Sequence, residues 1–236
     1  MQNAIASPRR QEVLHRVVLL STPLTLAILE LGHPLLDRMN PISMLAPIAT
    51  WWIVLHLLLV PLFALMGWAL FLLIRNLHSR AATVSRYATV VFTAFAIEYD
   101  SVVGLNTGIL ASNASNLPKA QQSIILQGMH QLFANPAIVL SGYILVVAGA
   151  VSIFAAAWAL LQAGVPRLPA FVLLGTVLAA YSHALPYEPL GSTCFFLAAL
   201  WIELVWRKLP CKEKEATTAL SVPDLHGSDT AEVSSG

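Results

Sequence analysis

Six apolar segments, each long enough to cross a bilayer, divide the sequence. A membrane-spanning helix needs about 20 apolar residues to cross the hydrocarbon core. The segments lie near residues 17–35, 48–74, 87–110, 136–161, 168–185 and 190–206. The last two are separated only by Pro186-Tyr187-Glu188-Pro189, whose two prolines break a helix and favour a tight hairpin. The pattern predicts an all-α fold, a polytopic membrane bundle of six transmembrane helices over residues 17–206.

The positive charges predict how this bundle is oriented, because Lys and Arg in short loops stay in the cytoplasm. The segment 1–16, alternate loops and the tail 207–236 hold Arg9, Arg10, Arg16, Arg75, Arg80, Arg86, Arg167, Arg207, Lys208, Lys212 and Lys214. The other loops hold only Arg38 and Lys119. We therefore predict a multi-pass protein of the cell membrane with both termini in the cytoplasm. The tail is rich in Lys, Glu, Thr, Ser and Asp, which predicts disorder.

The longest outer connection, residues 111–135, has a helical pattern of its own. Asn116 and Pro118 suit the start of a helix, and Asn135-Pro136 ends it. Its apolar side would comprise Ile125, Met129, Leu132 and Phe133. We predict a short amphipathic helix on the outer surface, packed against the helix ends or closing over a cavity.

The composition agrees with a lipid environment and excludes several other classes of protein. Hydrophobic residues make up 57% of the chain and charged residues 11%, against about 25% charged in soluble domains. The 13 Lys and Arg against 12 Asp and Glu give no basic surface for nucleic acid. Cys194 and Cys211 stand far apart and form no CxxC motif. The sequence also lacks a phosphate-binding glycine loop, a nucleophile elbow and an HExxH motif.

Six ionisable residues share one depth in the predicted bundle. At about 1.5 Å per residue, each lies roughly 18–28 Å above the cytoplasmic Arg that flanks its helix. They are Glu30, His33, His56, Glu98, Asp100 and His183. That is the outer half of a core about 30 Å thick, where an ionised acid costs about 2.5–3.5 kcal/mol. Pro34 and Pro61 are expected to free the carbonyls of Glu30 and Leu57 nearby. The shared depth predicts a polar pocket open to the outer face.

Helical geometry separates the two acids of the third segment. Asp100 falls on a stripe of small and polar residues that ends in the Gly104–Gly108 GxxxG motif, whereas Glu98 is turned about 200° away. Glu98 is expected to meet a different helix or to stay protonated. His183 shares a small-residue face of the fifth segment, so Asp100 and His183 both point into the bundle. The candidate ligand or ion pocket is Glu30, His33, His56, Asp100 and His183. The small faces also allow a homo-oligomer.

Four interpretations of this layer remain open. The five residues suit a divalent metal, and a metal-bound water would make the protein a membrane hydrolase. Protonatable groups at one depth suit a proton-coupled transporter, and the polar layer also suits a structural or sensory protein without chemistry. Haem between His56 and His183 is not favoured, because it leaves the acids unexplained. The run from Leu55 to Phe63, with the helix of Asp100 and Gly104, resembles bacterial multi-pass membrane proteins in general and implies no particular activity. A binding role is favoured over an enzymatic one.

Overall fold

A computed structural model describes residues 8–182 and 185–208 of the chain. Of these residues 84% are helical and none forms a strand, which confirms the all-α prediction. His183 and the tail from residue 209 onward lie outside the described residues. Four helices are long and apolar enough to cross a membrane: Arg10–Glu30, Pro41–Leu73, Arg80–Ala114 and Pro136–Gln162. Arg167–Tyr181 is a shorter apolar helix.

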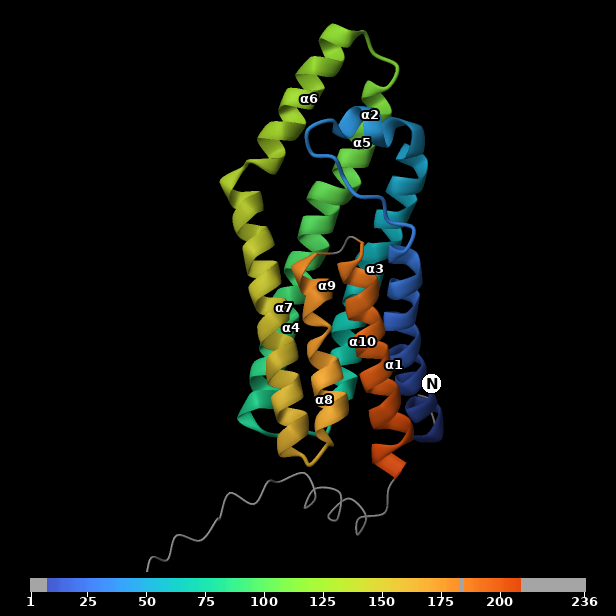
Figure 1. Cartoon of the computed structure of the whole chain (residues 1–236), viewed down its shortest axis with the longest axis vertical. Helices are drawn as coiled ribbons and strands as arrows, with labels where there is room; N and C mark the ends of the chain where they lie inside the picture. The colour runs from blue at the N-terminus through green and yellow to red at the C-terminus, as the bar shows by residue number, and fades with distance from the viewer. Residues whose placement is uncertain (1–7, 183–184, 209–236) are drawn as a thin grey trace, which may run out of the picture.

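The helices follow one another in short connections (Figure 1). They are α1 Pro8–Glu30, α2 Pro41–Leu45, α3 Ala49–Leu73, α4 Arg80–Tyr99, α5 Asn106–Ala114, α6 Lys119–Phe133, α7 Pro136–Gln162, α8 Arg167–Leu174, α9 Val177–Tyr181 and α10 Tyr187–Leu204. Two 3₁₀ turns, η1 Ala46–Ile48 and η3 Trp206–Lys208, adjoin α3 and α10. A π-helix, η2 Asp100–Leu105, joins α4 to α5. The helix α2 was not expected, and α1 begins before residue 17, where the first span was predicted.

Local sequence explains several helix ends. The Ser79 hydroxyl accepts a hydrogen bond from the Ala82 N–H at 3.2 Å and caps α4. Asn135 caps α7 in the same way, with Pro136 in the first helical position. The expectation for Pro34 was wrong. Because α1 ends at Glu30, the Glu30 carbonyl accepts a hydrogen bond from the His33 N–H at 3.1 Å and is not freed.

The bundle is built by α4 against α7, α1 against α3 and α10, and α8 and α9 against α10 and α7. Its core is aliphatic, with fully buried Leu19, Leu55 and Leu59 beside Phe195. At one end α2, α5 and α6 extend beyond the tops of α1, α9 and α10 (Figure 1). Met129 of α6 is fully buried there, in a small cluster with Ile42 of α2 and Ala114 of α5.

The opposite end of the bundle holds a group of five charged side chains, called here the arginine cluster: Glu12, Arg16, Arg75, Glu203 and Arg207. Glu203 is completely buried and forms ion pairs with Arg16, at 3.6 Å, and with Arg207. Arg207 also donates to the Leu73 carbonyl at the end of α3, at 2.9 Å. These contacts tie the ends of α1, α3 and α10 together.

Candidate functional site

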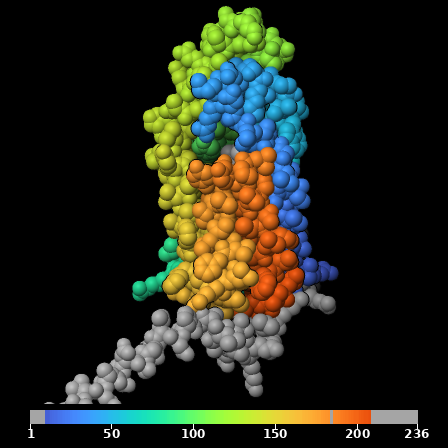
Figure 2. All heavy atoms as spheres, in the orientation of Figure 1, coloured from blue at the N-terminus to red at the C-terminus, as the bar shows by residue number. Residues whose placement is uncertain are grey.

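A cavity of about 500 Å³ lies inside the bundle and is called here the pocket. Its apolar wall is formed by Leu26, Phe63, Met66, Phe92, Ile153 and Phe195. Its polar wall is formed by His33, Trp52, His56, Asp100 and Glu188. Leu36, Arg38, Phe133, Tyr143 and Tyr181 line it toward the end that carries α2 and α6. Figure 2 shows the surface hollowed where α7, the segment between α1 and α2, and the upper end of α9 meet.

Asp100 reaches this pocket from the first residue of the π-helix η2. A π-helix adds a residue to a turn, and such insertions are frequent at functional sites. Asp100 is 2% exposed, and neither of its carboxylate oxygens has a hydrogen-bond partner among the described residues. Within the same π-helix the Gly104 carbonyl accepts a hydrogen bond from the Trp52 indole N–H at 2.6 Å. The π-helix is thereby attached to α3.

His56 is the described side chain that pairs with Asp100. Its Nδ1 lies 2.8 Å from the Trp52 carbonyl oxygen, and since a carbonyl only accepts, Nδ1 carries the hydrogen. Its Nε2 lies 3.7 Å from Asp100 Oδ1. The backbone of α3 therefore fixes the ring orientation of His56 and turns Nε2 toward the acid.

His33 and Trp52 form a cluster of three rings with His56, in tilted and edge-to-face contact. The ring centroids are 5.0 Å apart for His33 and Trp52, 5.3 Å for His33 and His56, and 4.4 Å for Trp52 and His56. His33 is 2% exposed, although it lies outside α1 in the segment that follows it. The candidate pocket inferred from the sequence did not include Trp52.

Two further buried acids, Glu30 and Glu188, belong to this part of the bundle. Glu30, at the last residue of α1, is completely buried, and neither carboxylate oxygen has a hydrogen-bond partner in the described part of the chain. Glu188 is 3% exposed and accepts a hydrogen bond from the Ser192 hydroxyl at 2.7 Å. Glu30 is within electrostatic reach of both Glu188 and Asp100. Asp100 and Glu188 thus line the pocket, and Glu30 lies buried near both of them.

Glu188 was missed because it was assigned to the hairpin between the last two apolar segments. In the structure α10 begins at Tyr187, and Pro189 falls in its first turn, where proline is tolerated. The extra turn brings Glu188 into the bundle. The spacing of Glu188 and Ser192 by four residues, on one helix face, was the available signal.

Glu98 lies apart from the other acids, as its helical offset predicted. Its carboxylate accepts a hydrogen bond from the Ser141 hydroxyl of α7. The prediction that Glu98 meets a different helix is therefore confirmed. Of the five candidate residues, the structure brings together Glu30, His33, His56 and Asp100, while His183 lies outside the described residues.

The metal interpretation needs several ligands close together, one of which, His183, lies outside the described residues. Within residues 8–182 and 185–208, no three His, Cys, Asp or Glu side chains are placed so that they could hold one metal ion. Comparison with protein-family models, curated proteins and solved structures finds no match. The geometry of the pocket is therefore the basis for any statement about function.

Proposed function

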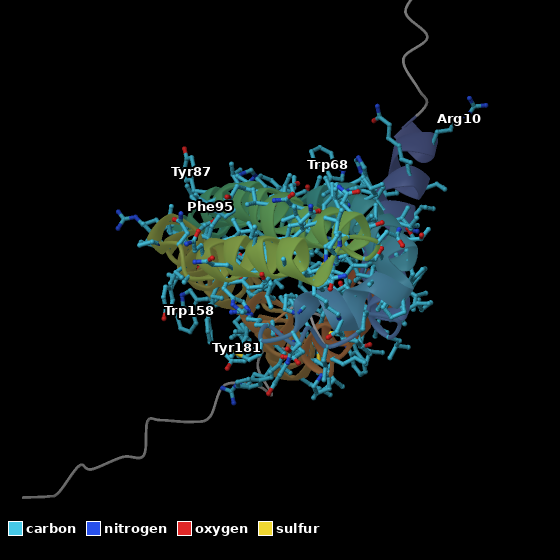
Figure 3. All side chains as sticks on the ribbon, turned by 90° about the horizontal axis from the view of Figure 1, so that it is seen from above. Arg10, Trp68, Tyr87, Phe95, Trp158 and Tyr181 are labelled. Carbon is cyan, nitrogen blue, oxygen red and sulfur yellow. The ribbon has the colours of Figure 1, made fainter. Side chains whose placement is uncertain are left out.

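We propose that this protein is an integral membrane protein of six spans that binds a small molecule in the pocket, in the outer half of the bilayer. The four long apolar helices are compatible with a membrane protein. We assign the fifth span to α8 and α9 and the sixth to α10, which pack against each other and against the long helices. Large apolar side chains on the bundle surface support this, among them Trp68, Tyr87, Trp158 and Tyr181 (Figure 3).

The orientation that we propose places both termini in the cytoplasm and α6 on the outer surface. The arginine cluster supports it, since arginines from three separate predicted cytoplasmic segments meet at one end of the bundle. Arg86 belongs to the same end, where its guanidinium donates to the carbonyls of Ile74 and Leu77 at 3.0 and 2.7 Å.

Cysteine labelling in intact cells tests the orientation. In a chain with Cys194 and Cys211 changed to Ser, a membrane-impermeant maleimide should label Ser123→Cys without permeabilisation. It should label His78→Cys only after permeabilisation. Both positions are exposed, Ser123 on α6 and His78 in the loop before α4. Labelling of His78→Cys in intact cells would contradict the proposed orientation.

The observation that carries the binding function is the cavity of about 500 Å³ with buried Asp100 in its wall. Ligand pockets typically enclose about 300–1,000 Å³ and combine an apolar lining with a few polar groups. An acid without a hydrogen-bond partner among the described residues, lining such a cavity, is an arrangement that a bound molecule completes.

Blocking the pocket tests this function. Val146 lines the pocket, while its neighbour Val147 is 60% exposed on the outside of α7. We expect Val146→Trp to abolish binding of small aromatic probes, because the indole fills the cavity, and Val147→Trp to leave binding unchanged. The probes are 2-phenylethylamine, 2-phenylethanol and 3-phenylpropanoate, titrated by calorimetry into protein in phosphatidylcholine nanodiscs, with empty nanodiscs as the blank. Binding of none of the three probes to the wild type, or equal binding to both variants, would refute the function.

A further inference from the structure

We infer that the pocket takes an organic cation, with an ammonium or guanidinium group on an apolar body, and that Asp100 and Glu188 provide the counter-charge. This inference rests on the proposed function and names the chemical class of its ligand. It rests on three observations: the charges that line the pocket, the Asp100 carboxylate oxygens that accept no hydrogen bond from the described residues, and the aromatic side chains of the lining.

The described charges of the pocket favour a cation at its inner end. Asp100 and Glu188 line the pocket, and Glu30, which is completely buried, lies within electrostatic reach of both. The positive side chain on the lining is Arg38, which is exposed at the other end and lies over the Phe133 ring, 5.9 Å from its centroid. A carboxylate ligand beside Asp100 or Glu188 would be repelled, because like charges at short range in a low dielectric repel strongly.

Asp100 has acceptor capacity that the described protein groups do not use. A carboxylate accepts about four hydrogen bonds, but neither oxygen of Asp100 receives one from the described residues, and His56 Nε2 lies 3.7 Å away, beyond ordinary hydrogen-bond length. A primary ammonium brings three donors and a positive charge. Such a group satisfies Asp100 and neutralises it at once, whereas a neutral alcohol brings one donor and no charge.

The remaining lining suits an apolar body and stabilises a cation further. Phe63, Phe92 and Phe195 line the wall on α3, α4 and α10, and Tyr99 lies next to Asp100 in the chain. Aromatic faces attract ammonium and guanidinium groups, and a desolvated site strengthens that attraction. The pocket thus offers acids for the head group and aromatic rings for the body.

Charge-matched probes test the ligand class. At pH 7 the wild type should bind 2-phenylethylamine at least about tenfold more tightly than 2-phenylethanol, and 3-phenylpropanoate most weakly. Asp100→Asn should weaken amine binding about 30-fold, as expected for loss of a buried charge pair, and Glu188→Gln should also weaken it. Alcohol binding should persist in both variants, which shows that the pocket remains intact.

Glu98→Gln is the matched control, because Glu98 is two residues from Asp100 but bonds to Ser141 away from the pocket. It should leave amine affinity unchanged. The inference would be overturned, while the proposed function stands, if the protein binds 2-phenylethanol as tightly as 2-phenylethylamine. It would also be overturned if Asp100→Asn and Glu188→Gln both leave the amine affinity unchanged. Failure of all three probes would refute both.

Discussion

Replacing Gly104 with alanine is expected to destabilise the bundle by about 3 kcal/mol and to push His56 away from Asp100. A Cβ atom at Gly104 would lie 1.9 Å from Cδ2 and 2.5 Å from Nε2 of His56, so the imidazole has to move. The ring has little room, because it is completely buried, bonded to the Trp52 carbonyl and in edge-to-face contact with His33. Over-packing of this kind costs more where the neighbour cannot yield.

Gly128 provides the control for this substitution. It also lies within a helix, α6, but a Cβ atom there would have nothing within 4 Å. Gly128→Ala should stabilise the protein slightly, by up to about 1 kcal/mol, because alanine restricts the unfolded chain. The measurement is thermal unfolding in detergent, combined with the affinity for 2-phenylethylamine. If Gly104→Ala and Gly128→Ala unfold at the same temperature, and Gly104→Ala keeps its affinity for 2-phenylethylamine, the close packing of η2 on α3 is wrong.

The sequence predicted the helices well where a span has strong boundary signals. The second and fourth segments, 48–74 and 136–161, match α3 Ala49–Leu73 and α7 Pro136–Gln162 to within a residue. An unbroken apolar run and, for α7, the Asn135-Pro136 start account for this agreement. The first span, predicted near residues 17–35 from its apolar run, was less accurate, because α1 begins at Pro8 and ends at Glu30.

The candidate site was predicted in part, by depth along each helix. Counting residues from the flanking arginines placed Glu30, His33, His56 and Asp100 at one level. In the structure His33, His56 and Asp100 line the pocket, and Glu30 is buried within electrostatic reach of Asp100. Depth alone does not reveal which neighbouring groups they contact. The ring contact with Trp52 and the approach of His56 to Gly104 depend on the rotation of α3 against η2, which a single sequence does not determine.

The π-helix itself was also beyond sequence reasoning. An added residue in a turn is stabilised by contacts such as the Trp52 hydrogen bond to the Gly104 carbonyl, across 52 positions of the chain. The regular 3.6-residue period still separated Glu98 from Asp100 correctly, because Glu98 precedes the π-helix and Asp100 is its first residue.

Removing the buried charge of the arginine cluster should produce a second large effect. Glu203→Gln is expected to destabilise the protein by about 3 kcal/mol, because it leaves Arg207 and Arg16 without their shared counter-charge. Arg207 is 20% exposed, so water replaces only part of the lost interaction. Its bond to the Leu73 carbonyl should weaken as well, and hydrogen exchange should rise first over residues 200–208.

Glu12 is the matched control at the same end of the bundle. It pairs with Arg16 at 3.3 Å and with Arg75 at 3.4 Å, but its side chain is 50% exposed. Exposed ion pairs contribute little, so Glu12→Gln should cost under about 1 kcal/mol. High salt should lower the stability contributed by Glu12 more than that contributed by Glu203, since screening acts mainly on solvent-exposed charges. Equal losses for the two variants would mean that Glu203 is hydrated in the protein, and that the ends of α1, α3 and α10 are held by apolar packing instead.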